Sequence, residues 1–278
     1  MKGIILHGGS GTRLRPLTYT DVKQLLPLAG KPVSEYILNN MIEIGINEIN
    51  IITGEVGDRE VRDYYGDGSK WSIKIDYTYQ GKPLGIAHAI GLIADFVKDE
   101  DFIVALGDNY FQNGFKSLSD EYDKSKVDAL IALTPVKDAH RFGIAEVDGK
   151  KITRLVEKPK NPKSNLAIAG VYFLNKKIFP VIQKLSPSQR GELEITDAIQ
   201  NLITEGNTVA YSVIHGWWKD TGTVDEFLDC NRMVLDKIAE RSISVVTGAK
   251  IIGRVQVEDD VEISDDSIIQ GPCFIGRG

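Results

Sequence analysis

The chain has 278 residues, 42% of them hydrophobic and 26% charged, which is the composition of a globular domain with room for an appendage. Its net charge of −6 excludes the basic balance that nucleic-acid-binding proteins usually show, and no apolar stretch approaches the length of a membrane span. Two cysteines give no disulfide framework and the N-terminus does not read as a signal peptide, so we expect a cytoplasmic protein with neither membrane nor nucleic acid as partner.

Apolar runs that predict β-strands alternate with amphipathic segments that predict helices along most of the chain. The predicted strands cover residues 3–6, 49–53, 73–79, 101–106, 129–134, 168–174 and 208–213. The predicted helices cover residues 33–44, 60–65, 86–97, 115–125, 176–182, 196–205 and 224–241. This alternation indicates an α/β fold, a Rossmann-like and mostly parallel sheet with helices on both faces. Ligands of such sheets bind outside the carboxyl ends of the strands, where the loop after the first strand lies.

The last stretch of the chain follows a different period. Branched apolar residues recur every six positions, at Val245, Ile251, Val257, Ile263, Ile269 and Ile275, and smaller or apolar residues follow four positions later at Val255, Val261, Ser267 and Cys273. A period of six fits neither a helix nor a hairpin and predicts a left-handed hexapeptide β-helix with three hexads per coil. A chance run of alternating strand residues is the alternative. We expect this segment at 242–278, either cut short inside a hexad or limited to a coil or two.

The loop after the first predicted strand reads HGGSGTR and places Gly8, Gly9 and Gly11 before Arg13. It lacks the third glycine of a dinucleotide-binding fingerprint and the Gly-Lys-Ser/Thr of a P-loop. Glycines let main-chain N–H groups face phosphate oxygens, and Arg13 adds a rigid fork of donors. With Lys23 as a second cation, the loop predicts a cradle for a triphosphate. A turn without a ligand is the alternative for any single loop of this kind.

HGGSGTRLRPLT, followed by KQLLPLAGKP, resembles the signature of the sugar-1-phosphate nucleotidylyltransferases and, within them, the glucose-1-phosphate thymidylyltransferase group. The resemblance covers about residues 1–240 and implies the nucleotide-diphospho-sugar transferase fold, with a catalytic domain at 1–241. Arg13 and Lys23 match the family's phosphate-binding arginine and lysine, and with Lys158 they are the catalytic residues that it implies. One departure is the pair Asp-Val before the lysine, where members often have Gly-Pro or Ser.

Two glutamines bear on the choice of base. An amide side chain offers a donor and an acceptor in one plane, which suits the N3–H and the neighbouring carbonyl of a pyrimidine. Gln24 follows the second cation, and Gln80 opens QGKPLGIAHA, which resembles the family's base-binding loop. Gln24 favours dTTP and leaves UTP open, and a surface role is the alternative for either glutamine alone. The implied nucleotide-binding residues are Gly8, Gly9, Gly11, Arg13, Gln24, Gln80, Gly85 and Asp108.

Two aspartates are expected to share one Mg²⁺. Asp108 follows an apolar strand, where a carboxylate is placed to hold a hard metal, although turn chemistry explains it equally well. Its triplet Gly-Asp-Asn resembles the family motif whose aspartate binds Mg²⁺, and Asp220 in WWKDTGT resembles the second metal-binding aspartate. Oxygen ligands from two distant strands suit a Mg²⁺ that bridges phosphates. The four histidines lack metal-ligand spacing, so we expect structural or surface roles for them.

The sugar side of the site is implied by the resemblance. The FG at 142–143 resembles a turn that contacts the hexose through its backbone, with Phe where many relatives have Tyr. In EKP at 157–159 the glutamate would accept hydrogen bonds from sugar hydroxyls and the lysine would neutralise the sugar phosphate, whereas such a pair is otherwise usually a solvated face. RGELEITD at 190–197 begins a helix, with its arginine near phosphate and Glu194 and Asp197 as capping residues. The implied sugar-binding residues are Asn109, Gly143, Glu157, Lys158, Val171 and Arg190.

These features together predict a Mg²⁺-dependent nucleotidyltransferase that joins dTTP and glucose 1-phosphate into dTDP-glucose and releases pyrophosphate. A phosphate monoester is already ionised at pH 7, so positioning and charge stabilisation suffice without a general base. The alternatives are a UTP-using sugar-1-phosphate uridylyltransferase, a non-catalytic regulator that binds nucleotide sugars, and a bifunctional acyltransferase, for which the hexapeptide tail is short. We also expect a homo-oligomer.

Overall fold

The computed structural model describes residues 1–238 and 248–277. Within them, the nine strands of the largest sheet are β1 (Lys2–His7), β4 (Glu48–Gly54), β5 (Lys74–Gly81), β6 (Phe102–Leu106), β8 (Ala129–Pro135), β9 (Gly143–Asp148), β10 (Lys151–Glu157), β11 (Leu166–Leu174) and β12 (Val209–Val213). Seven strands follow the order β10-β9-β11-β6-β1-β4-β5, with β8 beside β11 and β12 beside β8. β5, β4, β1 and β6 are mutually parallel, whereas β11 runs antiparallel to its neighbours β6 and β8. The sheet is therefore mostly parallel at the side that contains β1.

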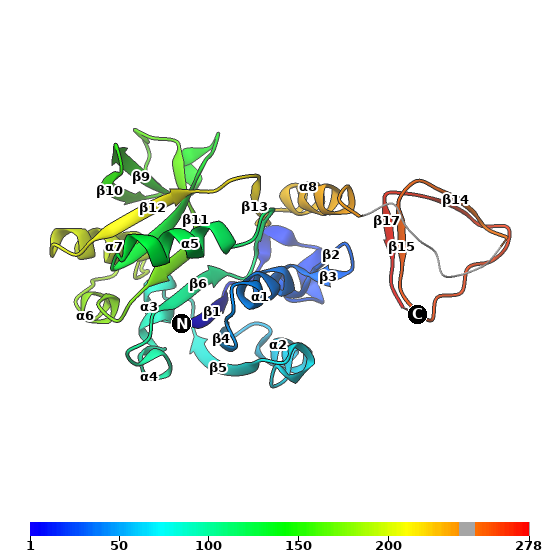
Figure 1. Cartoon of the computed structure of the whole chain (residues 1–278), viewed down its shortest axis with the longest axis horizontal. Helices are drawn as coiled ribbons and strands as arrows, with labels where there is room; N and C mark the ends of the chain where they lie inside the picture. Colours follow the sequence, from blue (N-terminus) through cyan, green and yellow to red (C-terminus); the bar gives the residue numbers. More distant parts are fainter. Residues whose placement is uncertain (239–247, 278) are drawn as a thin grey trace.

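Helices cover both faces of this sheet (Figure 1). One layer holds α1 (Val33–Glu43), α2 (Asp58–Tyr65) and α5 (Lys116–Ser125), and the other holds α3 (Ile86–Gly91), α4 (Ala94–Val97), α6 (Ile178–Gln183) and α7 (Ile195–Thr204). Successive side chains of a strand point to opposite faces, so Ile5 packs in the first layer while Ile4 and Leu6 pack in the second. Burial on both faces explains why β1 reads as a continuous apolar run.

The order of the strands reverses at β1, which places two loops side by side. β4 lies on one side of β1 and β6 on the other, and Leu6 pairs with Leu106 at their carboxyl ends. The Gly107 N–H continues this pairing by donating to the Leu6 carbonyl at 2.9 Å. The glycine loop after β1 and the loop that carries Asp108 therefore start at one corner of the sheet, the position where open α/β sheets bind ligands.

The predicted α/β class and all seven predicted strands are confirmed, and the differences are local. The helix predicted at 86–97 is two short helices, α3 and α4, because Ile93 leaves helical geometry at φ −102° and ψ 14°. The hairpin of β9 and β10 was not predicted, although an Asp-Gly turn between two alternating runs is its sequence signal. β7 (Asn109–Phe111) and β13 (Trp218–Asp220) form a second, two-stranded antiparallel sheet, and three residues are too few to show a period.

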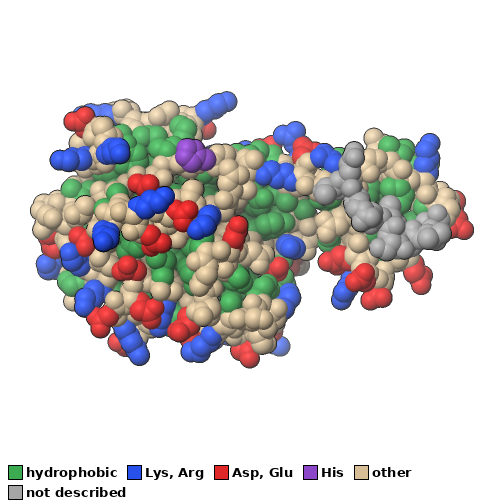
Figure 2. Space-filling model, in the orientation of Figure 1, with side chains coloured by type: hydrophobic (Ala, Val, Ile, Leu, Met, Phe, Trp, Pro, Cys, Tyr) green, Lys and Arg blue, Asp and Glu red, His purple; other side chains and the backbone are tan. Residues whose placement is uncertain are grey.

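Residues 248–277 form a tail beyond α8 (Val224–Leu235), seen as a separate lobe in Figures 1 and 2. β14 (Lys250–Ile252) pairs in parallel with β16 (Ile268–Gln270), and β15 (Val255–Val257) pairs in parallel with β17 (Cys273–Ile275). In both pairs each residue faces one eighteen positions further along the chain. Val255 is buried and the period-six residues from 251 to 275 are half-buried, whereas Ile268 is 71% exposed. The helix predicted at 224–241 is shorter in the structure, because α8 ends at Leu235 and residues 236–238 form a turn. Val245 and the predicted boundary at 241/242 lie outside the described residues.

The tail contacts the larger body at a hairpin, β2 (Pro27–Leu28) and β3 (Lys31–Pro32). The ring of Phe274 lies over Gly30 in the turn of this hairpin, where a Cβ atom would come within 2.0 Å of the ring. Gly30 also has a φ of +85°, so both the contact and the backbone favour glycine here. Arg254 adds an ion pair with Asp236 after α8 at 3.3 Å. Across the described residues, every helix is too short or too polar to cross a membrane.

Candidate active site

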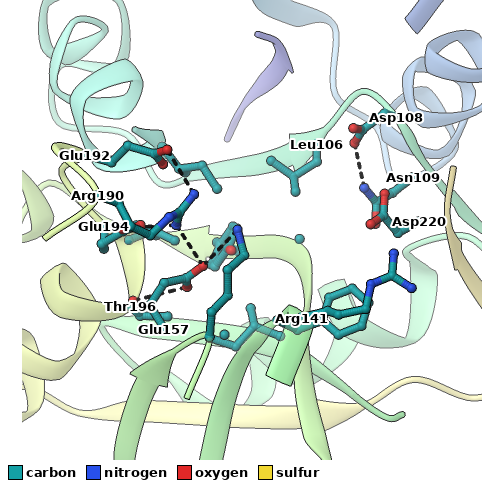
Figure 3. Close-up of a pocket in the computed structure, with 18 of the residues that line it drawn as sticks. Leu106, Asp108, Asn109, Arg141, Glu157, Arg190, Glu192, Glu194, Thr196 and Asp220 are labelled. Carbon is teal, nitrogen blue, oxygen red and sulfur yellow. Dashed lines mark hydrogen bonds and ion pairs between the residues drawn. The ribbon is translucent and has the colours of Figure 1, made fainter. Parts of the chain in front are cut away.

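Two adjoining cavities open at the carboxyl edge of the sheet. The larger has a volume of about 610 Å³ and is shown in Figure 3. The smaller, of about 280 Å³, lies against the glycine loop and is lined by Gly8, Gly9, Gln80 and Gly85 among others. The residues that line both cavities are Ile86, Leu106, Asp108 and Glu192. A ligand with two unlike halves could therefore lie across the junction between them.

The glycine loop brings one free cation to the larger cavity. Arg13 lines that cavity, is exposed, and forms no ion pair with residues 1–238 or 248–277. Its guanidinium approaches Asp220 across Gly222, since a Cβ atom on Gly222 would lie 3.3 Å from Arg13 Nη2 and 3.2 Å from each Asp220 carboxylate oxygen. Gly11 precedes the arginine with a φ of +63°, and Thr18 Oγ1 donates to its carbonyl at 2.7 Å. The loop thus holds an unpaired guanidinium at the cavity wall.

Lys23, Asp108 and Asp220 form a charged cluster in the same cavity. The Lys23 ammonium pairs with the Asp108 carboxylate. Burial lowers the pKa of Lys23, but the charges of Asp108 and Asp220 more than offset this and the net shift is upward. Burial likewise raises the pKa of Asp108, and Lys23 reverses the shift so that Asp108 stays ionised. Burial and the charge of Asp108 raise the pKa of Asp220 to about 6.

The two aspartates meet because their strands pair. Asp220 lies opposite Asn109 where β13 runs antiparallel to β7. Thr221 then donates twice to the Asp108 carbonyl, from its N–H at 3.1 Å and from its Oγ1 at 2.7 Å. Asn109 donates to the Asp108 carboxylate at 2.8 Å and accepts from Trp218 Nε1 at 2.6 Å. Asn109, predicted to bind the sugar, thus orients Asp108 through its Nδ2, while its Oδ1 is held by Trp218.

The chemistry of this cluster fits one hard divalent cation. In the described part of the chain no group of three or more His, Cys, Asp or Glu side chains is arranged as a metal site. Mg²⁺ commonly takes only one or two carboxylates, with waters and substrate phosphates as its other ligands. Asp108 and Asp220 supply two carboxylates to one cavity, and each raises the cost of the other's charge. A cation between them would relieve that repulsion, so the donor set fits Mg²⁺.

At the other end of the cavity, one arginine holds three carboxylates (Figure 3). Arg190 pairs with Glu192 at 2.9 Å, with Glu194 at 3.2 Å and with Glu157 at 3.4 Å. Glu157 also accepts from Thr196 Oγ1 at 3.5 Å, and burial raises its pKa. Carboxylate oxygens only accept hydrogen bonds, so this end suits a ligand rich in hydroxyl groups. Arg190 was predicted to reach a phosphate, and in the structure its guanidinium is paired with these three glutamates.

The remaining predicted sugar-binding residues lie around these glutamates. Lys158 is exposed, lines the cavity, and its ammonium lies 3.7 Å from Glu157. Gly143 lines the cavity at a point where a Cβ atom would come within 2.7 Å of Thr196 and 3.0 Å of Glu157. Val171 is fully buried in β11 and does not line the cavity, so only its backbone could reach a ligand, whereas its neighbour Gly170, at a φ of +73°, does line the cavity.

The two predicted base-reading glutamines occupy different environments. Gln80 lines the smaller cavity, where its amide donates to the Gly85 carbonyl at 3.1 Å and lies 3.1 Å from His88 Nδ1. Gln24 is 1% exposed, lines neither cavity, and donates to the Gly8 carbonyl at 2.9 Å. Gln80 therefore lies in the lining of the smaller cavity, whereas the Gln24 side chain lies beneath the glycine loop. A contact between Gln24 and the base stays a prediction: the side chain is enclosed, and its Oε1 has no hydrogen-bond partner among the described residues.

Several cavity residues were missed by the sequence reasoning. Arg141 lines the larger cavity and is held by Glu226 at 2.7 Å; a cation directly before the FG turn was its signal. Glu192 pairs with Arg190 and stands at the junction of the cavities, inside the RGELEITD segment. Tyr172 lines the cavity from an apolar strand; it belongs to the Gly-Val-Tyr triplet that resembles the family's backbone contact under the sugar ring, but its side chain was given no role. His7 lines neither cavity and is buried just before the glycine loop, where burial lowers its pKa to about 3.

Comparison with known proteins gives the class to which this site belongs. Residues 2–237 match the family model described as nucleotidyl transferase. The chain is 45% identical over 261 residues to the low-salt glycan biosynthesis nucleotidyltransferase Agl11 of Haloferax volcanii. The matched region covers 93% of this chain and 73% of that protein. It is 43% identical over 280 residues to a glucose-1-phosphate thymidylyltransferase of Streptomyces griseus, with 100% of this chain and 78% of that protein covered.

A solved structure agrees with these relatives. The fold superposes with a TM-score of 0.80 and 38% identity on a Bacillus anthracis protein, provisionally named a glucose-1-phosphate thymidylyltransferase and crystallised with sucrose; 87% of this chain and 98% of that chain are covered. The chain belongs to the nucleotidyl transferase family and is an enzyme of that family. Within the family it is of the same type as the glucose-1-phosphate thymidylyltransferases, two of which it resembles over its whole length at 43% identity.

Proposed function

We propose that the chain transfers a thymidylyl group from dTTP to glucose 1-phosphate, yielding dTDP-glucose and pyrophosphate. One observation supports this above the others. A single cavity has the unpaired Arg13 beside the Lys23, Asp108 and Asp220 cluster at one end, and the hydroxyl-accepting glutamates at the other. The names of the Streptomyces and Bacillus relatives point to the same substrates. Phosphate chemistry at one end and sugar recognition at the other are what such a transfer needs.

The reaction is an in-line displacement at the α-phosphorus of the nucleotide. An oxygen of the sugar phosphate forms a bond to this phosphorus while the bond to the β-phosphate oxygen breaks, and that electron pair leaves with pyrophosphate. The attacking oxygen is already ionised at pH 7, so no proton has to be removed. Rate enhancement then comes from alignment and from the stabilisation of charge on the phosphoryl oxygens.

The cations of the cavity divide between the two substrates. We assign Arg13 and Lys23 to the triphosphate, because both lie beside the glycine loop, whose Gly8, Gly9 and Gly11 can turn N–H groups to phosphate. We assign Lys158 to the phosphate of the sugar, because its exposed ammonium lies at the glutamate end. With cations on both sides, the attacking and leaving oxygens would face each other across the centre of the cavity.

Asp108 and Asp220 are proposed to hold Mg²⁺ when it is bound. The ion would neutralise charge on the triphosphate oxygens, a contribution typical of metal-assisted phosphoryl transfer. In the protein itself, Asn109 and Thr221 fix the position of Asp108, and Lys23 keeps its carboxylate ionised. Asp220 is the more easily protonated of the two, since its pKa is raised to about 6.

The sugar ring is proposed to lie between Gly143, the backbone near Val171, and Glu157. Glu157 and Glu192 accept hydrogen bonds from its hydroxyls, held in place by Arg190. The smaller cavity is proposed to take the base, with Gln80 at its polar edge and Ile52 among its apolar walls. An apolar wall would favour the methyl group of thymine over uracil by about 0.8 kcal/mol.

For the tail we propose the hexapeptide β-helix. Its support is that parallel pairs link positions eighteen residues apart, which is three hexads, and that the period-six residues from 251 to 269 are less exposed than their immediate neighbours. Such short coils leave strand edges unpaired, which other chains can cover. We therefore propose that the protein is a homo-oligomer, and that the cytoplasm is its compartment because Cys230 and Cys273 are both free thiols.

The test is a substrate panel read by pyrophosphate release. dTTP, UTP, GTP and ATP are each combined with glucose 1-phosphate, galactose 1-phosphate and mannose 1-phosphate, with Mg²⁺ and without it. The proposal expects the highest kcat/KM for dTTP with glucose 1-phosphate, weaker turnover of UTP, and little of either purine nucleotide. Preference for UTP would make the protein a uridylyltransferase. Nucleotide-sugar binding without any pyrophosphate release would make it a non-catalytic regulator.

A further inference from the structure

We infer that Arg141 is a positioning residue, and that its ion pair with Glu226 fixes the sugar side of the larger cavity relative to the charged cluster at Asp220. Through this pair, Lys158 keeps the place from which it aligns the sugar phosphate with the nucleotide. The inference rests on the proposed function, because it concerns the alignment of the two substrates.

The ion pair joins two segments that are far apart in the sequence. Arg141 ends the short helix η5 (Ala139–Arg141) just before β9, and Glu226 lies in the first turn of α8. Arg141 Nη1 donates to Glu226 Oε1 at 2.7 Å, and the two side chains are 31% and 25% exposed. The pair is thus partly shielded from water, and a charged hydrogen bond in this setting holds its geometry better than one at an open surface.

On the side of the charged cluster, Glu226 is held at both of its carboxylate oxygens. Oε1 accepts from Arg141, and Oε2 accepts from the Thr223 hydroxyl at 3.0 Å. The Glu226 N–H donates back to Thr223 Oγ1 at 3.4 Å, which caps α8 three residues after Asp220. Burial raises the pKa of Glu226, but the hydrogen bonds from Arg141 and Thr223 more than offset this, so the net shift is downward and the carboxylate stays ionised.

On the sugar side, the turn that follows Arg141 is bonded to Lys158. The Lys158 N–H donates to the Phe142 carbonyl at 3.0 Å, and Lys158 has a left-handed φ of +40° there. Gly143 pairs with Glu157 where β9 meets β10, so the same turn also sets the position of that glutamate. A shift of Arg141 would therefore move both Lys158 and Glu157 relative to α8.

The guanidinium of Arg141 also faces the charged cluster, since Figure 3 shows it turned toward Asp220. The hydrogen bond to Glu226 raises the pKa of Arg141 most, and the charge of Asp220 adds to this. Phe142 and Trp218 form a second contact between the same two segments, with ring centres 5.5 Å apart and planes at 68°. Because this ring contact remains when the ion pair is lost, the two sides of the cavity should loosen without coming apart.

Glu226 can be changed without removing a wall of the larger cavity. It does not line that cavity and instead lines a third one, of about 520 Å³, which adjoins the larger cavity at Arg141. A Glu226 variant therefore acts on transfer through Arg141 and α8. Variants of Arg141 alone would not separate positioning from a direct contact with phosphate, because Arg141 lines the larger cavity itself.

Loss of alignment has its own kinetic signature. Under the proposed function the nucleotide is held by the glycine loop, Arg13 and Lys23, none of which pairs with Arg141 or Glu226. Its affinity in the absence of sugar phosphate should therefore stay the same. Transfer requires the two phosphates in line, and a displacement of about 1 Å among aligned groups lowers the rate by up to about 100-fold. The loss should thus fall on kcat and not on nucleotide binding.

The experiment measures kcat and both KM values by pyrophosphate release, and the dTTP dissociation constant by titration calorimetry with Mg²⁺ and without sugar phosphate. Glu226→Met keeps the length of the side chain but has no acceptor for Arg141, whereas Glu226→Gln keeps an acceptor oxygen. We expect kcat to fall about tenfold to 100-fold in Glu226→Met and about threefold or less in Glu226→Gln. The dissociation constant should stay within about twofold of the parent in both.

Arg141→Met extends the test to the other partner of the ion pair. If the two side chains act as a unit, the double variant with Glu226→Met should lose little more kcat than the worse of the two single variants. Independent roles would instead multiply the two losses. A direct contact between Arg141 and phosphate would make Arg141→Met much the more damaging of the single changes.

Arg62→Met is the matched control. Arg62 pairs with Asp58 at 2.9 Å, its side chain is 40% exposed, and it lies over the ring of Tyr77 as Arg141 lies over Phe142. It lines neither substrate cavity. Arg62→Met should leave kcat unchanged, and its melting temperature shows the effect of losing a comparable ion pair on stability alone.

The inference is overturned if Glu226→Met keeps the parental kcat, if its affinity for dTTP falls as much as its kcat, or if the losses in the double variant multiply. If another nucleotide and sugar phosphate prove to be the best pair, the proposed substrates fail, while the same variants assayed with that pair still decide the inference. A parent protein that turns over no pair would overturn both.

Discussion

Asp108 and Asp220, far apart in the sequence, face one cavity because the residue that follows Asp220 is fastened to the main chain of Asp108. Thr221 donates to the Asp108 carbonyl from both its N–H and its hydroxyl, and it is fully buried. The pairing of β7 with β13 brings the two carboxylates to the same cavity. The first two predictions concern this pair.

Asp108→Asn and Asp220→Asn should each lower kcat/KM by at least about 100-fold while leaving the fold intact. Each amide keeps the shape of the side chain but removes a charge that would hold Mg²⁺. The measurement is pyrophosphate release with saturating Mg²⁺, together with the circular dichroism spectrum and melting temperature. Full activity of either variant would remove that aspartate from the metal site.

Protons should compete with Mg²⁺ for Asp220. Its pKa is raised to about 6 in the metal-free protein, so it is ionised at pH 7.5 and takes up a proton as the pH falls through 6. The Mg²⁺ concentration for half-maximal rate should therefore be flat above pH 7 and rise about tenfold for each pH unit below 6. A rate profile at several Mg²⁺ concentrations tests this, and a Mg²⁺ requirement that does not change between pH 7.5 and 5 would contradict it.

Gly222→Ala should reduce kcat without unfolding the protein. The added methyl group would lie 3.2 to 3.3 Å from the Asp220 carboxylate and the Arg13 guanidinium, tighter than most such contacts, so one of them must move. We expect about a tenfold to 100-fold loss, since small displacements of aligned groups are costly in catalysis. Gly91→Ala, whose methyl group would lie 3.2 Å from Ile182 in the core, is a control for crowding away from the cavity. Equal activities of the two variants would count against the assigned role of Arg13.

His7→Leu should change how stability depends on pH. Both ring nitrogens of His7 are buried without a partner among the described residues, and its pKa is lowered from 6.5 to about 3. Below pH 6.5 the unfolded chain binds a proton there that the folded chain does not, so His7 makes the folded state lose about 1.4 kcal/mol per pH unit as the pH falls toward 3, and nothing above pH 6.5. The free energy of unfolding, measured with urea at pH 7.5, 6 and 5, should differ between parent and variant by an amount that grows as the pH falls. If the difference between the two free energies of unfolding does not change with pH, the His7 imidazole is in contact with water in the folded protein.

Removal of the tail after residue 238 should affect assembly and stability more than chemistry. The tail touches the β2–β3 hairpin through Phe274 and the end of α8 through Arg254, and it lines neither cavity. We expect a lower melting temperature or a smaller oligomer in size-exclusion chromatography with light scattering, and a kcat within a few-fold of the parent. A truncated protein with unaltered stability and assembly but no activity would refute this role. Phe274→Ala separates loss of the contact from loss of the whole tail.

The sequence was a good guide wherever a local pattern decides the outcome. Buried strands read as apolar runs, so Ile4 and Ile5 could be placed in the core, and glycine before Arg13 marked the loop. The resemblance also pointed to Asp108 and Asp220, and both line the larger cavity. None of these inferences depends on how a single side chain rotates.

The orientation of individual side chains, and the residues with which they pair, could not be predicted from the sequence. The Gln24 side chain points under the glycine loop, where its amide donates to the half-buried Gly8 carbonyl, and no local sequence pattern marks that partner. Arg190 is neutralised by glutamates from its own segment and from β10, which depends on how these elements pack. The pairing of β7 with β13 depends on tertiary structure, since strands of three residues carry little information about themselves.

The shared wall of the two cavities, with Asp108 and Glu192 at the junction, has a consequence for the end of the catalytic cycle. Under the proposed function the nucleotide lies across both cavities and the sugar phosphate lies at the glutamate end of the larger one, so each substrate could leave independently of the other. The product joins both halves by covalent bonds, so its second half rebinds at a high effective concentration whenever the first stays in place. The nucleotide sugar should therefore dissociate more slowly than either substrate. In that case kcat reports the escape of the product, and viscosity, which slows escape but not bond formation, should lower the turnover rate.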